Sequence, residues 1–217
     1  MATRAAVVFD NDGLLLDTEE AWTRAEVTLF ARRDRVFTLE HKRSLIGSAH
    51  AAAAAKLETM LERDGEGETL MDELHELVME EVLAGVPPRP GALELLKRLT
   101  DASVPVAVAS NSQREFVQRT LGGAGLLDGR FATVVSVEDV AHPKPAPDIY
   151  LEACRRLGAE PGACAALEDS PTGVASAAAA GMYVVGVPYF AGAELPGSDL
   201  LAGSLADPAV SAALGLG

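Results

Sequence analysis

The chain has 217 residues, of which 48% are hydrophobic and 23% charged, a composition that is typical of a globular protein and excludes a wholly disordered one. Its 18 basic and 32 acidic residues give a formal net charge of −14, which argues against nucleic acid or an anionic membrane surface as a partner. No run reaches the ~18 apolar residues of a membrane span, and the start lacks the long apolar region of a secretory signal. We therefore expect a cytoplasmic protein, and we expect it to be a monomer.

A short apolar run opens the chain and is followed by helical patterns. Residues 5–9 (AAVVF) predict a buried strand that ends at Asp10, and residues 18–33 predict an amphipathic helix. Helix-like segments continue over residues 39–84 until a cluster of prolines at 87–90 breaks the pattern. We therefore expect an all-helical segment inserted after the first strand.

The pattern then changes to an alternation of helices and strands. Such an alternation predicts an α/β fold, in which a doubly wound parallel sheet is covered by helices on both faces. The tail after residue 190 predicts only one weak further helix, near 198–214. The predicted helices cover 92–99, 115–121, 149–157 and 172–180, and the predicted strands cover 104–109, 133–137, 164–167 and 183–187.

Polar side chains follow the predicted strands at the points where the strands end. Because parallel strands end at the same edge of a sheet, these groups should converge there. They comprise four carboxylates, one lysine and part of a Ser-Asn-Ser turn. In chain order the candidate site residues are Asp10, Asp12, Ser110, Asn111, Lys144, Glu168 and Asp169.

Four neighbouring carboxylates repel one another unless a cation compensates their charge, and oxygen ligands favour Mg²⁺ as that cation. One oxygen of Asp10 could act as a nucleophile, and Asp12 could reach the same substrate as an acid or a base. Ser110 can donate to a phosphate oxygen, and Lys144 supplies a fixed positive charge. This chemistry is phosphoryl transfer through an aspartyl phosphate.

Each of these features also has a simpler structural explanation when it is taken alone. Two aspartates separated by one residue can form a solvated turn, and Ser-Asn-Ser before a helix can be an N-cap. Lys144 can be an ordinary loop residue, and Glu168 with Asp169 can form a strand-to-helix turn. The occurrence of all of them after strand-like runs, with complementary chemistry, favours a functional site. Cys154 and Cys164 lie in apolar patterns and are expected to be buried thiols, not a disulfide.

The segments FDNDGLLLDTE, ASNS, KPAPDIY and LEDSPTGVASAAAAGM resemble the four ordered motifs of the haloacid dehalogenase superfamily. The resemblance is to its beta-phosphoglucomutase-like branch of phosphatases and mutases, and it covers residues 5–188. It implies a Rossmann-like core (residues 1–17 and 87–217) with a helical cap domain (residues 18–86).

The resemblance also implies a role for each matched residue. Asp10 would be the nucleophile and a metal ligand, and Asp12 would be the general acid and base and would bind Mg²⁺ through its backbone carbonyl. Glu168 and Asp169 would hold the metal. The residues implied to bind the phosphoryl group are Ser110 with its neighbour Asn111, and Lys144.

Within the family, three positions bear on the activity. Dehalogenases and phosphonate-cleaving members lack the second aspartate, which is present here as Asp12. Phosphoglucomutase-like members carry an arginine just after the glycine of the cap loop, where this chain (LIGSAHAAA) has His50, and they tend to have a histidine where this chain has Trp22. Both departures weaken the mutase interpretation.

The leading hypothesis is therefore an Mg²⁺-dependent phosphatase that acts on a small phosphorylated metabolite such as a sugar or polyol phosphate. The alternatives are a phosphosugar mutase and a non-enzymatic binding protein that kept the fold. In the cap loop, Gly47 and His50, with Ser48 and Ala49 between them, are expected to face the substrate when the cap closes.

Overall fold

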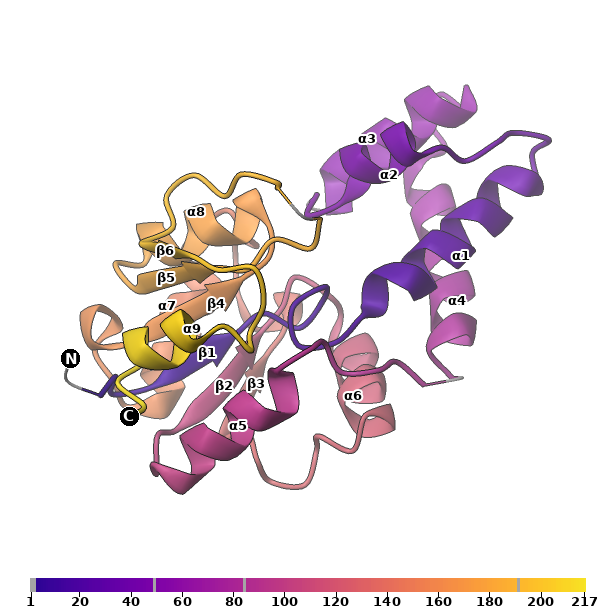
Figure 1. Ribbon diagram of the computed structural model, residues 1–217. Coiled ribbons are helices and arrows are strands. Elements are labelled where there is room, and N and C mark those ends of the chain that lie inside the picture. The colour runs from indigo at the N-terminus through magenta and orange to yellow at the C-terminus, as the bar shows by residue number, and fades with distance from the viewer. Residues whose placement is uncertain (1–2, 49, 84, 191) are drawn as a thin grey trace.

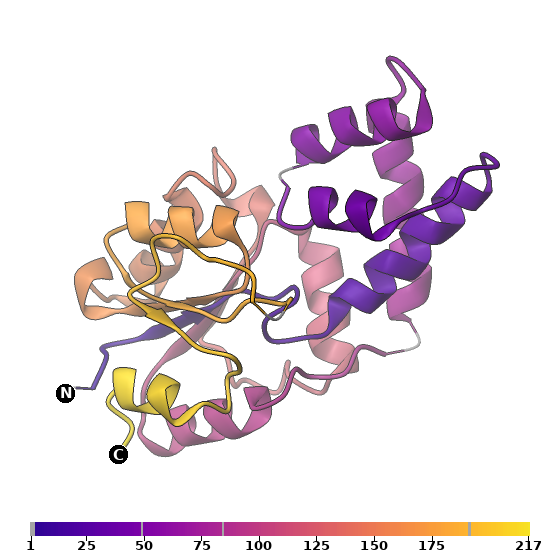
Figure 2. The ribbon, with the colours of Figure 1, turned by 45° about the horizontal axis from the view of Figure 1, so that its top comes forward.

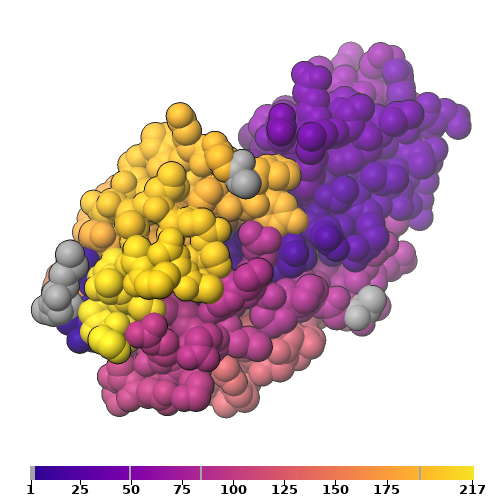
Figure 3. Space-filling view, in the orientation of Figure 1, coloured from indigo at the N-terminus to yellow at the C-terminus, as the bar shows by residue number. Residues whose placement is uncertain are grey.

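The computed structural model describes residues 3–48, 50–83, 85–190 and 192–217. A parallel sheet with helices on both faces forms one lobe, and helices α1 to α4 form a second lobe beside it (Figures 1 and 2). The space-filling view shows the same two lobes, with the early, indigo and violet part of the chain forming the smaller one (Figure 3). No helix among the described residues is both long enough and apolar enough to cross a membrane.

The sheet has six strands in the order β3-β2-β1-β4-β5-β6, and every neighbouring pair is parallel. The chain winds outward from β1 in one direction through β2 and β3, and then in the other direction through β4, β5 and β6. The predicted doubly wound α/β fold is therefore confirmed, with its switch point between β1 and β4. The strands are β1 (Val7–Phe9), β2 (Val106–Ala109), β3 (Thr133–Val135), β4 (Ala165–Glu168), β5 (Tyr183–Gly186) and β6 (Leu200–Leu201).

Successive side chains of each strand point to opposite faces of the sheet, and each face is covered by its own apolar layer. In β1, Val7 and Phe9 belong to the layer that includes α5, α6 and α9, whereas Val8 belongs to the layer that includes α7 and α8. Both faces are buried, which explains why these strands are continuous apolar runs without a polar face. The helices of this lobe are α5 (Ala92–Asp101), α6 (Arg114–Gly123), α7 (Asp148–Leu157), α8 (Pro171–Ala179) and α9 (Pro208–Ala213), with short 3-10 turns at Val137–Asp139 and Pro161–Ala163.

The helical lobe consists of α1 (Thr18–Ala31), α2 (Leu39–Leu45), α3 (His50–Leu61) and α4 (Gly67–Val82). Its interior is formed by fully buried side chains such as Phe30, Leu57 and Leu70. This interior is continuous with the α5–α6 side of the sheet, and the rings of Trp22 and Phe116 meet there at a centroid distance of 5.6 Å. The two lobes therefore share one hydrophobic core on this side.

Two chain segments connect the lobes and run antiparallel to each other. The N–H of Asp17 donates to the carbonyl of Pro87 (2.9 Å), and the N–H of Arg89 donates to the carbonyl of Leu15 (2.9 Å). Leu16 and Pro88 form the bridge between them. The proline cluster thus forms one half of a paired linker at the lobe boundary.

The prediction of one helix over residues 198–214 is wrong. Leu200–Leu201 instead forms β6 at the edge of the sheet, where the N–H of Ala202 donates to the carbonyl of Gly186 (2.9 Å). A separate helix, α9, begins after Asp207, whose carboxylate accepts from the N–H of Ala209 (2.9 Å). The open sheet edge offers backbone hydrogen bonds that local sequence preference does not reveal. The N-terminal segment lies beside this tail, with the N–H of Arg4 donating to the carbonyl of Leu214 (3.2 Å).

Candidate active site

A cavity of about 610 Å³ lies between the carboxyl ends of the strands and the helical lobe. Asp10 follows β1, Ser110 follows β2, and Asp169 follows β4. Glu168 is the last residue of β4, one position further into the strand than the sequence predicts. The sheet thus brings together residues that are up to 159 positions apart in the chain, because parallel strands place their carboxyl ends side by side.

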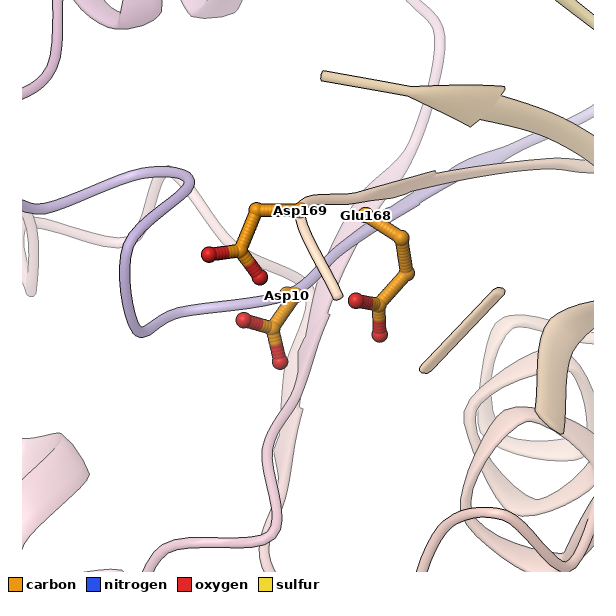
Figure 4. Close-up of side chains that lie close together, drawn as sticks. All are labelled: Asp10, Glu168 and Asp169. Atoms are coloured by element: carbon orange, nitrogen blue, oxygen red, sulfur yellow. The ribbon is translucent and has the colours of Figure 1, made fainter. Parts of the chain in front are cut away.

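The carboxylates of Asp10, Glu168 and Asp169 point toward one another (Figure 4). Each offers an oxygen within 4.8 Å of the other two, and all three residues are buried. Burial, together with the neighbouring negative charges, raises the pKa of both Asp10 and Asp169 well above the usual range of aspartate. Three buried oxygen ligands around one point fit a hard divalent cation, which would compensate this repulsion.

Lys144 compensates part of this charge from the loop before α7. Its ammonium donates to Asp10 Oδ1 (2.6 Å), Glu168 Oε1 (2.6 Å) and the carbonyl of Ala109 (2.9 Å), and the residue is only 3% exposed. Burial alone would lower its pKa, but the charges of Asp10 and Glu168 outweigh burial and raise it. The lysine is therefore permanently charged.

Asn111 and Tyr150 hold this arrangement in place. The side-chain oxygen of Asn111 accepts from the N–H of Lys144 (2.9 Å), and its amide donates to the carbonyl of Lys144 (3.2 Å). The Tyr150 hydroxyl donates to Glu168 Oε1 (2.5 Å). Both polar atoms of the Asn111 side chain are thus engaged with the backbone of the lysine loop, so the side chain fixes that loop.

Asp12 faces the cavity from the turn after β1. Its Oδ2 accepts from the hydroxyls of Ser112 (2.8 Å) and Ser110 (3.0 Å), and its Oδ1 accepts from the Asn11 amide (3.2 Å). Burial raises the pKa of Asp12, and these hydrogen bonds oppose the rise. The carboxyl group is therefore held in a fixed orientation, and its proton affinity is higher than that of an exposed aspartate.

Gly13 allows the turn that carries Asp12. Its φ is +74°, and a Cβ there would lie 2.2 Å from Asp169 Oδ2. Only glycine accommodates both the backbone conformation and the close approach of that carboxylate. The turn after β1 therefore packs directly against the carboxylate of Asp169, which follows β4.

Gly47, Ser48 and His50 line the same cavity from the helical lobe, and Ala49 lies outside the described residues. Gly47 has a φ of +68°, and a Cβ there would lie 3.0 Å from the Cβ of Ser170, so the two lobes approach closely at this point. The imidazole Nε2 of His50 lies 2.9 Å from Glu68 Oε2 on α4.

Sequence reasoning did not assign several residues that line or support the cavity. Ser112 and Tyr150 lie inside the quoted motifs ASNS and KPAPDIY, so their position in these motifs was an available signal. Glu19 and Glu26 are seven residues apart and therefore share one face of α1, a face that is otherwise apolar. Lys42 lies on α2 and forms ion pairs with both glutamates, and no sequence pattern around it indicates these pairs.

The sequence profile of the haloacid dehalogenase-like hydrolases matches residues 5–181 of the chain. Protein CbbY of Rhodobacter capsulatus is 32% identical over 208 residues, which cover 89% of this chain and 90% of CbbY. Fructose-1-phosphate phosphatase YqaB of Escherichia coli is 31% identical over 183 residues, which cover 84% of this chain and 96% of YqaB. A longer relative from Arabidopsis thaliana is matched over only 18% of its own length.

The fold agrees with these sequence relationships. A crystal structure of a CbbY mutant from Rhodobacter sphaeroides in complex with xylulose-(1,5)bisphosphate has a TM-score of 0.82 to this chain. It is 27% identical, and the match covers 94% of this chain and 96% of that one. On the profile match, the curated relatives and the shared fold, the chain belongs to the haloacid dehalogenase-like hydrolase family and is a phosphoric monoester hydrolase.

Proposed function

We propose that the protein is an Mg²⁺-dependent phosphatase that hydrolyses a sugar or polyol phosphate through an aspartyl-phosphate intermediate. The observation that carries this proposal is the pairing of two aspartates, the buried Asp10 and the partly buried Asp12, which line the cavity from the end of β1 and the turn after it. The name of fructose-1-phosphate phosphatase YqaB, and the xylulose-(1,5)bisphosphate bound by the CbbY mutant of Rhodobacter sphaeroides, support the substrate class. Trp22 and His50 stand where phosphoglucomutase-like members tend to have a histidine and an arginine, and these differences favour hydrolysis over the mutase reaction.

In the first step, an oxygen of Asp10 attacks the phosphorus of the substrate and the bond from phosphorus to the alkoxide oxygen breaks. Asp12 gives its proton to the leaving alkoxide, for which its raised pKa makes it suitable. The Ser110 hydroxyl, which donates to Asp12 in the structure, would turn to donate to one phosphoryl oxygen of the bound substrate. Lys144, held by Asn111, keeps a positive charge beside Asp10 throughout.

In the second step, Asp12 takes a proton from water, which attacks the acyl phosphate on Asp10. The bond from phosphorus to the aspartate oxygen breaks, phosphate leaves, and both carboxyl groups return to their starting states. Asp10, Glu168 and Asp169, with the backbone carbonyl of Asp12, would hold Mg²⁺, which would supply positive charge for the phosphoryl oxygens.

We further propose that residues 18–86 act as a cap over a catalytic core formed by residues 1–17 and 87–217. The paired linker at Leu16 and Pro88 is the hinge, because it forms the connection between the lobes. Gly47 and His50 would contact the leaving group when the cap is closed.

The test is phosphate release from a panel of sugar and polyol monophosphates in the presence of Mg²⁺. Asp10→Asn should lower turnover by several orders of magnitude, because it removes the nucleophile. The matched control, Asp64→Asn, changes an exposed loop aspartate of the helical lobe and should leave turnover unchanged. Acid-quenched enzyme should carry a phosphoryl group on the peptide that contains Asp10. Near-normal turnover by Asp10→Asn would refute the mechanism, and formation of an isomeric sugar phosphate instead of free phosphate would favour the mutase.

A further inference from the structure

A second buried lysine lies in the wall of the cavity, in the helical lobe. The Lys42 ammonium on α2 donates to Glu26 Oε2 (3.1 Å) and lies 2.7 Å from Glu19 Oε2, both on α1. The three residues are between 4% and 8% exposed, and all three line the cavity. The charge of Lys42 is therefore already compensated by two carboxylates.

One oxygen of this group has no hydrogen bond. Glu19 Oε2 is buried and, among the described residues, its one polar partner is the Lys42 ammonium, 2.7 Å away in an ion pair, with no hydroxyl or amide directed at it. The ion pair compensates the charge of this oxygen, and the oxygen keeps a lone pair that can accept from a further donor when the cavity is filled. A hydroxyl group of a bound molecule is such a donor.

The charges of this wall also indicate what it excludes. The helical lobe contributes the carboxylates of Glu19, Glu26 and Asp72 to the lining, against the single ammonium of Lys42. His50 and His75 are the remaining titratable groups on this wall, and His50 faces Glu68. An anion placed against this wall would meet an excess of like charge in a partly buried site, which is unfavourable.

We propose that Glu19, Lys42 and Glu26 form a leaving-group subsite that binds the hydroxyl groups of an uncharged sugar or polyol and rejects a substrate with a second phosphate. This inference rests on the proposed function, because it assumes that the transferred phosphoryl group lies at Asp10. It separates this chain from its structural neighbour, the CbbY mutant solved with xylulose-(1,5)bisphosphate, despite the shared fold.

Fructose 1-phosphate and fructose 1,6-bisphosphate form a matched pair of substrates that differ only in the second phosphate. The wild-type protein should show a kcat/KM at least tenfold higher for the monophosphate. The assay is run at pH 8, because burial raises the pKa of Glu26 to about 7 and its carboxylate is charged there. Equal or preferred use of the bisphosphate would overturn the inference.

Variants test whether the three residues cause the preference. Glu26→Gln removes one negative charge and should narrow the ratio of the two kcat/KM values at least threefold. Lys42→Met removes the cation and should widen that ratio. Glu81→Gln is the matched control, since Glu81 pairs with Arg24 outside the cavity, and it should leave the ratio unchanged. A ratio in Glu26→Gln equal to that of the control would also overturn the inference.

Binding separates this inference from the proposed function. Calorimetric titration of Asp10→Asn with the same two compounds measures recognition without turnover. If no compound releases phosphate from the wild-type protein, the proposed function fails, and the order of the two affinities still decides the present inference. Tighter binding of fructose 1-phosphate supports the subsite, whereas equal or tighter binding of the bisphosphate refutes it.

Discussion

Replacing Lys144 by methionine tests how far the buried charges of the site depend on one another. The ammonium lies 2.6 Å from oxygens of both Asp10 and Glu168, so the substitution leaves two buried carboxylates without their cation. Removing one partner of a buried ion pair costs about 3–5 kcal/mol of unfolding free energy. For a chain of this length, that cost corresponds to a fall of about 6–20 °C in melting temperature.

The assay is thermal unfolding followed by circular dichroism, first without divalent cations and then with Mg²⁺. Mg²⁺ should stabilise Lys144→Met more than it stabilises the wild-type protein, because a bound cation replaces part of the lost charge. Lys97→Met is the matched control, since Lys97 pairs with Asp101 on the exposed face of α5 and should unfold close to the wild-type midpoint. A midpoint for Lys144→Met as close to wild type as that of the control would refute the reasoning.

Three further predictions follow from the site. Asp12→Asn should lower sugar-phosphate turnover by about 10²–10⁴-fold and should slow phospho-enzyme formation from p-nitrophenyl phosphate much less, which pre-steady-state kinetics would detect as a burst of nitrophenol. Activity should be lost in EDTA and should return when Mg²⁺ is added. Ca²⁺ should support little turnover because its coordination is looser than that of Mg²⁺. Full activity after chelation would contradict the metal site. Burial raises the pKa of Glu26 from 4.5 to about 7, so the folded protein keeps a proton that the unfolded chain releases, and the unfolding free energy should fall by about 3 kcal/mol between pH 4.5 and 7. Urea titrations of Glu26→Gln should show this pH dependence reduced, and an unchanged dependence would exclude Glu26 as its source.

The sequence predicts the alternation of strands and helices along the chain through β5, and the convergence of the polar residues, because both depend on local signals. Each strand is an apolar run, and polar residues such as Asp10 and Ser110 come directly after the run that positions them. A parallel sheet then brings strand ends together without further information. The roles of Gly47 and His50 in the helical lobe depend on how the lobes meet, and they stay predictions.

Contacts between elements that are distant in the chain were not predictable in this way. The edge strand Leu200–Leu201 exists because β5 offers unpaired backbone groups, and a two-residue strand has no periodicity of its own. The pairing of Lys42 with Glu19 and Glu26 depends on how α2 packs against α1. Similarly, the use of Asn111 to hold the backbone of Lys144 depends on the proximity of two loops 33 residues apart.

The placement of buried positive charge explains how so acidic a chain could select one anion and reject another. Lys144 and Lys42 each lie between two carboxylates, so neither lysine alone gives its part of the cavity a net positive charge. A divalent cation held by the acidic cluster of Figure 4 would change that balance at this end of the cavity only, because Asp10 and Asp169 line the cavity there and Glu168 lies beside them. The wall formed by the helical lobe would remain negative. The affinity for a phosphoryl group should therefore depend on the metal, and the identity of the leaving group should depend on hydroxyl groups that reach Glu19 and its partners.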